Sequence, residues 1–257
     1  LMFSALSNGP CEITGFLASE DCLATMRALT AMGVEIEQLG SGGTHLRVHG
    51  CRGVVKDPGR PIDCGNSGTT MRLLSGILAS KPFEVTLTGD ESLSKRPMNR
   101  VAIPLERMGA RIKGQGDRCT PPLKVSGQEK LTAIHYDSPV ASAQVKSAIL
   151  LAGLAAEGKT SVTEPNPSRD HTERMLSSLG VPLSRVGGIV RLEAARFSGE
   201  LPGFELEIPG DPSAAAFLIA AGLLVPESEV GVRGLCLNPT RTGFYDLLRQ
   251  LGAELVM

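Results

Sequence analysis

The chain has 257 residues, of which 42% are hydrophobic and 21% are charged. These shares are typical of a compact globular protein and exclude disordered and collagen-like chains. With 26 basic residues against 27 acidic ones, the net charge of −1 excludes a general attraction to nucleic acid or to an anionic membrane, so any anion site has to be built locally.

Four successive segments predict the same run of elements: an apolar helix, a strand, an amphipathic helix that ends at a glycine, and a polar strand. In chain order, the runs cover residues 1–9, 11–16 and 24–38, then 69–80, 83–89 and 101–114, then 143–158, 160–165 and 171–186, and finally 213–227, 229–235 and 244–257. The four glycines, Gly33, Gly109, Gly180 and Gly252, are 76, 71 and 72 residues apart, and each lies where a left-handed helix cap is needed.

This spacing indicates an internal repeat, and the repeat predicts the architecture. Apolar helices with little polar face belong inside a protein, beneath a surrounding layer. We therefore predict an α/β (α+β) fold, an inverse α/β-barrel-like domain in which buried helices lie within sheets built from βαβαββ units. Because the first repeat begins inside its helix and the fourth ends after its second helix, we expect the chain to be incomplete at both ends.

The cysteines and histidines do not predict a metal site. The six cysteines form no CxxC pair and nothing resembles a secretory signal, which favours a reduced, cytoplasmic protein. The longest apolar run, residues 214–225, is shorter than the roughly 20 residues needed to cross a bilayer. His45 and His49 lie in an alternating segment that predicts a strand, which would hold them roughly 13 Å apart.

The loop before the second apolar helix has the composition of an anion site. Gly65 and Gly68 permit close approach of the backbone. The neighbouring side chains add hydrogen-bonding groups, namely those of Asn66, Ser67, Thr69 and Thr70. Backbone N–H groups at a helix N-terminus suit a phosphate or a carboxylate. The alternative is an ordinary helix cap and turn.

The corresponding loop of the third repeat offers Ser142 and Gln144, with Lys146 close by. This mixture can hold a phosphate and a neighbouring hydroxyl or carboxylate. The alternative is that Ser142 caps the helix and Lys146 points to water. Elsewhere, Arg96 precedes a proline that holds the local backbone extended, which favours a fixed guanidinium for bidentate anion binding.

Three acidic residues are assigned to structural roles. Asp170 and Glu173 have the spacing of a capping box, which leaves Ser168 and Arg169 available to a ligand. Asp211 stands before a proline at a helix start, as is typical of an N-cap residue followed by proline at the first helical position.

Six segments resemble the EPSP synthase family in order and spacing along essentially the whole chain. They are GNSGTTMRLL, SLSKRPMNRV, ASAQVKSAILLAGL, PSRDHTERML, PGDPSAAAF and NPTRTG. One such segment alone would be weak evidence, but six in register are specific. The related UDP-N-acetylglucosamine enolpyruvyl transferases are the alternative family, and their reactive-cysteine loop is absent here because the matching stretch reads SLSKRPMNR.

The resemblance implies a two-domain protein of six βαβαββ units, three in each domain, with substrates bound in the cleft between the domains. Residues 1–207 would form one three-unit domain with its first unit truncated, and residues 208–257 would form the incomplete first unit of the other domain. The full-length enzyme is expected to be monomeric, with no metal and no organic cofactor.

The implied reaction transfers the enolpyruvyl (carboxyvinyl) group of phosphoenolpyruvate to the 5-hydroxyl of shikimate 3-phosphate and releases phosphate, in the shikimate pathway to chorismate and the aromatic amino acids. By motif, the phosphoenolpyruvate-binding residues are Asn66, Gly68, Arg96 and Gln144, and the shikimate 3-phosphate-binding residues are Ser142, Ala143, Gln144, Ser168 and Arg169. Glyphosate is expected to compete at the phosphoenolpyruvate site.

The family's acid and base residues fall outside this chain, so the catalytic residues are not assigned. A non-catalytic, substrate-binding fragment is the alternative function. Because the binding loops occupy equivalent points of successive repeats, pseudo-symmetry predicts that they converge on one side of the domain.

Overall fold

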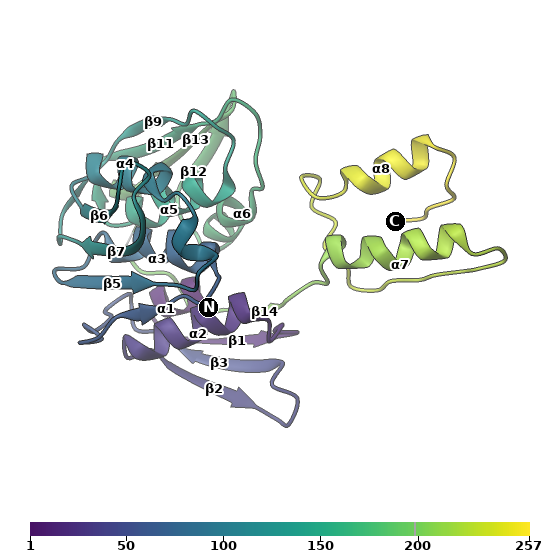
Figure 1. Ribbon diagram of the computed structural model, residues 1–257, viewed down its shortest axis with the longest axis horizontal. Coiled ribbons are helices and arrows are strands. Elements are labelled where there is room, and N and C mark those ends of the chain that lie inside the picture. The colour runs from purple at the N-terminus through teal and green to yellow at the C-terminus, as the bar shows by residue number, and fades with distance from the viewer. Residues whose placement is uncertain (198) are drawn as a thin grey trace. The chain divides into compact units, whose positions relative to one another are not determined.

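The computed structural model describes residues 1–197 and 199–257 and shows two compact units, Leu1–Leu206 and Glu207–Met257 (Figure 1). The first unit holds three sheets of four strands each, together with the short parallel pair β8 (Leu131–Thr132) and β10 (Ala156–Glu157). Each four-stranded sheet belongs to one of the predicted repeats.

The second repeat shows the complete pattern. Its elements are β4 (Ile62–Asp63), α3 (Gly68–Leu78), β5 (Glu84–Thr88), the 3₁₀ turn η1 (Leu93–Lys95), α4 (Asn99–Arg107), β6 (Arg111–Gln115) and β7 (Thr120–Ser126). The sheet order is β4-β5-β7-β6, with β4 parallel to β5 and the other two pairs antiparallel. This is a βαβαββ unit, as the repeat predicts.

The third repeat has the same topology. It consists of β9 (His135–Asp137), α5 (Ala143–Gly153), β11 (Lys159–Thr163), α6 (His171–Ser178), β12 (Leu183–Val186) and β13 (Ile189–Glu193), followed by the 3₁₀ turn η2 (Ala194–Arg196). Here β9 is parallel to β11, which pairs antiparallel with β13, which in turn pairs antiparallel with β12. If the four strands of a repeat are numbered in chain order, both sheets have the spatial order 1-2-4-3.

The sheet of the first repeat is completed by a strand from the end of the first unit. Its elements are α1 (Met2–Leu6), β1 (Pro10–Thr14), α2 (Glu20–Ala31), β2 (Glu35–Leu39) and β3 (His45–His49). The sheet order β14-β1-β3-β2 puts β14 (Glu205–Glu207) in the place that β4 and β9 hold in their own sheets. The three sheets and their inner helices confirm the predicted inverse α/β-barrel-like fold of three βαβαββ units.

The helices α3 and α5 form the interior of this unit, because nearly all their residues are buried. They approach each other at Gly76, where an added Cβ would lie 2.9 Å from the Ala148 Cα atom. Helices α2, α4 and α6 instead bury one face and expose the other, as their mixed sequences require. The glycine at position 76 is therefore a packing requirement of the central helix pair.

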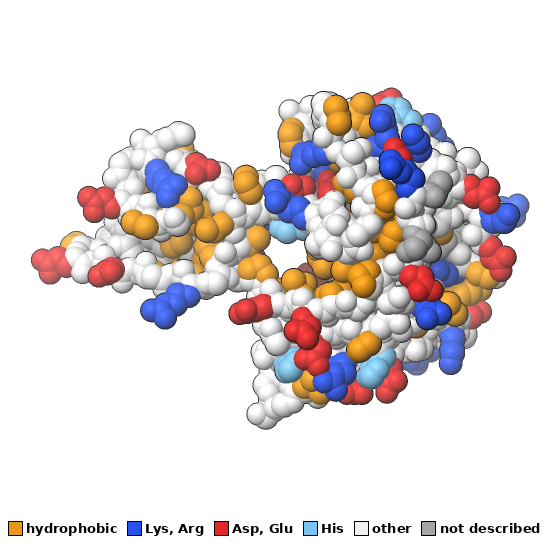
Figure 2. Space-filling model, turned by 180° about the vertical axis from the view of Figure 1, so that it is seen from behind, with side chains coloured by type: hydrophobic (Ala, Val, Ile, Leu, Met, Phe, Trp, Pro, Cys, Tyr) orange, Lys and Arg blue, Asp and Glu red, His pale blue; other side chains and the backbone are white. Residues whose placement is uncertain are grey.

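The second unit consists of α7 (Pro212–Leu224) and α8 (Gly243–Gln250). Asp211 caps α7 by accepting the Ser213 N–H at 2.9 Å with proline at the first helical position, so its predicted structural role is confirmed. Tyr245 is buried and donates its hydroxyl to the Pro212 carbonyl. Hydrophobic side chains lie on the surface of this unit (Figure 2), with Phe217 81% and Leu224 83% exposed.

The strands predicted at 229–235 and at the end of the fourth repeat are wrong. Within residues 208–257, the only ladder contact is the isolated bridge between Gly210 and Leu235. A strand requires a hydrogen-bonding neighbour along its length, and beyond this single bridge none pairs with these segments in the described unit. No helix in the described residues is long and apolar enough to span a membrane.

We expect Gly76→Ala to lower the free energy of unfolding by about 1–3 kcal/mol, because the methyl group overpacks the contact between α3 and α5. Gly42→Ala is the matched control, since its Cβ would meet only the Thr44 hydroxyl at 3.6 Å. Urea unfolding of the two variants measures the difference. Equal stability would mean that the two helices separate at no cost.

Candidate functional site

The first turn of α3 is shaped by a serine cap. Ser67 is the N-cap residue, and its Oγ accepts the Thr70 N–H at 3.1 Å. The structure therefore confirms a helix cap in this loop and leaves the side chain of Asn66 exposed beside it. The Asn66 carbonyl accepts the Gly68 N–H at 3.1 Å, which places both predicted residues in one tight turn.

A buried arginine lies directly beneath this turn. Arg72 of α3 is only 9% exposed, and it donates from Nη1 to Gln144 Oε1 at 2.8 Å and from Nη2 to the Pro97 carbonyl at 3.3 Å. Its buried Nε has no hydrogen-bond partner among the described residues. Burial, followed by the like charges of Arg100 and Arg96, lowers the pKa of Arg72 to about 10. The guanidinium is therefore charged at neutral pH, and the charges that act on it are positive.

Gly68 separates two of these guanidinium groups. A Cβ at position 68 would lie 2.6 Å from Arg72 Nη1 and 3.3 Å from Arg96 Nη1. Arg96 follows η1 in an extended conformation and donates to the Ser92 hydroxyl at 3.2 Å. The absence of a side chain at Gly68 thus permits two positive groups to approach the N-terminus of α3, where the helix dipole also favours an anion.

Gln144 joins the second and third repeats. In addition to accepting from Arg72, it donates from Nε2 to Thr69 Oγ1 at 2.8 Å. The first turns of α3 and α5 therefore meet through one amide side chain. Of the predicted phosphoenolpyruvate-binding residues, Gly68, Arg96 and Gln144 gather around Arg72, and Asn66 lies in the same turn as Gly68.

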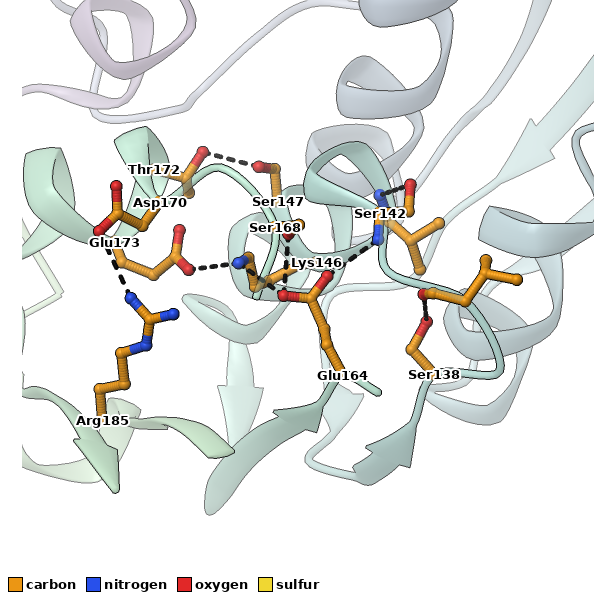
Figure 3. Close-up of polar contacts among 12 residues, drawn as sticks. Ser138, Ser142, Lys146, Ser147, Glu164, Ser168, Asp170, Thr172, Glu173 and Arg185 are labelled. Carbon is orange, nitrogen blue, oxygen red and sulfur yellow. Dashed lines mark hydrogen bonds and ion pairs between the residues drawn. The ribbon is translucent and has the colours of Figure 1, made fainter. Parts of the chain in front are cut away.

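The N-terminus of α5 is tied to the end of β11. Ser142 caps α5 by accepting the Val145 N–H at 3.5 Å, and its own N–H donates to Glu164 Oε1 at 2.9 Å. Ser168 donates its hydroxyl to Glu164 Oε2 at 2.8 Å (Figure 3). Two of the predicted shikimate 3-phosphate-binding residues, Ser142 and Ser168, are therefore held by the same carboxylate.

Both interpretations of Lys146, as a phosphate ligand and as a side chain pointing to water, are wrong. Its side chain is 0% exposed, and Nζ lies 2.7 Å from both Glu164 Oε2 and Glu173 Oε1 (Figure 3). The carboxylates are also buried, at 5% and 6% exposure. Lys146 is the one charged residue of α5 and lies in its buried first turn, so its ammonium group is paired inside the protein.

The predicted capping box of α6 is also wrong. Asp170 is the N-cap residue, but its carboxylate pairs with Arg174 at 3.0 Å and with Arg185 at 3.4 Å. Glu173 instead points inward and pairs with Lys146. An unpaired buried ammonium group would cost more free energy than the loss of a capping hydrogen bond, which water can replace. Both acidic residues do keep structural roles.

A small pocket of about 150 Å³ opens between the N-terminal turns of α3, α5 and α6. Its wall includes the predicted residues Ala143, Gln144 and Arg169, together with Thr69, Leu73, Ser147, His171 and Thr172. The Ser147 and Thr172 hydroxyls are 2.7 Å apart, which links α5 to α6 at the side of the pocket. All the predicted ligand residues therefore lie on the loops and first turns of the second and third repeats.

A larger open hollow of about 680 Å³ lies over the first sheet, away from these residues. It is lined in part by Glu12, Arg47 and His49. As predicted, His45 and His49 lie on a strand, and they bond to Glu12 at 3.4 Å and to Glu37 at 2.9 Å. These contacts are cross-strand side-chain hydrogen bonds on the sheet surface.

The amino-acid sequence as a whole matches the model of one family, EPSP synthase (3-phosphoshikimate 1-carboxyvinyltransferase), over residues 1–256. The chain belongs to the EPSP synthase family. This family membership confirms the resemblance carried by the six motifs.

Two curated relatives show how much of an EPSP synthase the chain represents. It is 51% identical to the 3-phosphoshikimate 1-carboxyvinyltransferase of Methylococcus capsulatus and 49% identical to that of Bacillus subtilis, covering 99% of this chain in both cases and 57% and 58% of the relatives. A solved EPSP synthase structure from Acinetobacter baumannii matches with a TM-score of 0.91 and 47% identity, over 99% of this chain and 56% of that one. The chain thus spans little more than half the length of these relatives.

Two residues of this candidate site could not be assigned from the motifs alone. Arg72 lies inside the apolar segment TTMRLLSGILAS, and a lone arginine in such a helix is a signal for a buried, functional charge. Glu164 directly follows β11, in the segment TSVTEP, and gives no comparable signal. Its role depends on three donors from two other segments, Ser142 and Lys146 of the α5 region and Ser168.

We expect Lys146→Met to lower the free energy of unfolding by about 3–5 kcal/mol, because it leaves two buried carboxylates without their shared cation. Lys124→Met is the control: Lys124 pairs with Glu84 at 3.6 Å on the surface, and both side chains are more than half exposed. Loss of such a pair changes stability by about 1 kcal/mol or less. Chemical denaturation of both variants tests this, and an equal, small loss would contradict the buried pairing.

Proposed function

We propose that this chain is the substrate-binding part of an enzyme that transfers the enolpyruvyl group of phosphoenolpyruvate to the 5-hydroxyl of shikimate 3-phosphate and releases phosphate. Its relatives are named 3-phosphoshikimate 1-carboxyvinyltransferases. We place this reaction in the shikimate pathway to chorismate and the aromatic amino acids. The observation that carries the proposal is Gln144, whose two hydrogen bonds join a positively charged turn to the serine-containing loop of the next repeat.

The positive turn suits phosphoenolpyruvate. This substrate has a phosphate and a carboxylate, and Arg96, Arg72 and the N-terminus of α3 offer positive charge and N–H donors around Gly68. We assign Asn66, Gly68, Arg96 and Gln144 to this substrate, with Arg72 holding Gln144 in place. Charges that are desolvated before the substrate arrives stabilise negative charge more strongly than solvated ones.

The adjacent pocket suits shikimate 3-phosphate. We assign Ser142, Ala143, Gln144, Ser168 and Arg169 to this substrate, since they lie around or beside the pocket between α5 and α6. The Ser142 Oγ accepts from Val145, which leaves its own proton for a ligand oxygen. Gln144 belongs to both subsites and would bring the two substrates side by side.

In the proposed reaction, the 5-hydroxyl adds to C2 of phosphoenolpyruvate while the methylene carbon takes a proton. Phosphate then leaves the tetrahedral intermediate while the new methyl group loses a proton, which restores the C=C bond of the enolpyruvyl group. The residues of this chain bind and orient the two anions, which converts a bimolecular addition into a step within one complex. We propose that the acid and the base come from the part of the relatives' length that this chain does not span.

Family resemblance also supports the arrangement of the whole enzyme. We propose that residues 1–207 are a three-unit domain, that residues 208–257 begin a second domain of the same kind, and that the complete enzyme is a cytoplasmic monomer. Neither a metal nor an organic cofactor has a part in the proposed reaction.

We expect Gly68→Ala to relieve inhibition by glyphosate and to raise the KM for phosphoenolpyruvate. The added methyl group would displace the Arg72 and Arg96 guanidiniums, which lie 2.6 and 3.3 Å from its position. Steady-state inhibition is measured in a complete enzyme made by joining this chain to the remaining part of the Methylococcus capsulatus relative. Identical inhibition of the parent and the variant would contradict this steric account.

We expect the 257-residue chain by itself to bind shikimate 3-phosphate weakly and to have no measurable transferase activity. General acid and base groups each contribute about 10²- to 10⁴-fold to a rate, and closure around the substrates adds to this. Phosphate release from the two substrates measures turnover, and calorimetry with shikimate 3-phosphate measures binding. Turnover of about 1 to 10³ per second would show that the chain contains the catalytic groups.

A further inference from the structure

The Glu164 carboxylate accepts hydrogen bonds both from the loop before α5 and from the segment before α6. Its Oε1 accepts the backbone N–H of Ser142 at 2.9 Å. Its Oε2 accepts the Ser168 hydroxyl and the Lys146 ammonium, at 2.8 and 2.7 Å. Both oxygens are therefore occupied, and the two serines are linked through a single side chain (Figure 3).

This carboxylate is ionised although its side chain is buried. Burial alone would raise the pKa of Glu164, but the hydrogen bonds from Lys146 and Ser168, the charge of Lys146 and the Ser142 N–H together lower it below its ordinary value. An ionised carboxylate has the four lone-pair positions that three donors require. A neutral amide in its place has one oxygen, so it cannot accept from all three.

Glu164 is one of two buried carboxylates that contact the Lys146 ammonium group. Glu173 approaches the same ammonium at the same distance of 2.7 Å from α6. The cluster therefore has one cation and two buried carboxylates, of which Glu164 carries the contacts to both serines. The two glutamates are alike in burial and in their distance from Lys146, but only Glu164 accepts hydrogen bonds from the two serines.

We infer that Glu164 is a positioning residue for shikimate 3-phosphate: it fixes Ser142 and Ser168 at the spacing that the ligand requires, and Lys146 holds it in place. The inference rests on the proposed function, because the ligand is the one assigned there to the two serines. Glu164 does not touch the ligand itself. It acts through the backbone of one serine and the hydroxyl of the other.

The pair Glu164→Gln and Glu173→Gln tests this role. Each variant removes one negative charge beside Lys146, so any general electrostatic effect on a phosphate ligand is the same in both. Only Glu164→Gln removes an acceptor from the serines. Calorimetry with shikimate 3-phosphate on the 257-residue chain gives the dissociation constants, and urea unfolding gives the stability of each variant.

We expect Glu164→Gln to weaken shikimate 3-phosphate binding on the order of 10-fold or more, the size of one charged hydrogen bond, and Glu173→Gln to leave it within about 2-fold of the parent. The Glu164→Gln, Ser168→Ala double variant should bind no more weakly than the weaker single variant, because both changes remove one coupled contact. A role limited to folding would follow stability and would not couple to Ser168.

The possible failures are distinct. Equal affinities of the two glutamine variants would overturn the positioning role and leave the proposed function standing. A parent chain that binds no shikimate 3-phosphate at millimolar concentration would overturn the assigned subsite, and the inference with it.

If Glu164→Gln does not fold, amide hydrogen exchange of the parent chain replaces it. The Ser142 amide precedes α5 and is outside any helix or strand ladder, so protection there depends on Glu164. Slow exchange supports the inference. Exchange as fast as that of a solvated amide overturns it.

Discussion

Helices α3 and α5 pack so closely that a glycine is required where they meet, and this contact sets the position of everything at their N-termini. At Gly76 the two backbones are separated by less than the width of a side chain. The helices are nearly all buried, so neither can tilt without opening the core. Their first turns are consequently held side by side, and Gln144 can reach Thr69 and Arg72 across the boundary between two repeats.

The two charged clusters at these N-termini are built in opposite ways. Around Gly68, the charges acting on Arg72 are those of other arginines, and its Nε has no partner in the described residues. Around Lys146, two buried carboxylates share one ammonium group at close range. An unneutralised positive cluster is prepared for an anion, whereas a paired cluster stiffens its surroundings. The same interior therefore supplies both attraction for a ligand and a rigid frame beside it.

The repeat and the motifs could be predicted from the sequence, because both depend on local patterns. Apolar helices and glycine caps recur at fixed spacing, and they predicted the three βαβαββ units that the sheets confirm. The burial of Lys146 and its pairing with two glutamates could not be predicted in this way. Its partners are Glu164 at the end of a strand and Glu173 on another helix, and no local pattern links the three.

The same limit applies to the arginine cluster and to the fourth repeat. The Arg72 guanidinium is held by hydrogen bonds to Pro97 and Gln144, which lie in segments far from it in the sequence. The strand expected at 229–235 had a suitable local sequence, but its only pairing in the described unit is the isolated bridge from Leu235 to Gly210. Local propensity predicts which segments can form an element, and tertiary partners decide whether they do.

The strand β14 has a consequence for how the first unit is made. It completes the sheet of the first repeat, yet it follows β1 by about 190 residues, a separation that makes its pairing one of the slowest contacts to form. During synthesis, the second and third repeats have all their own strands before residue 205 leaves the ribosome. The edge of β1 stays open until then. Nascent chains of this protein are therefore exposed to wrong strand pairing along β1 until β14 has been made.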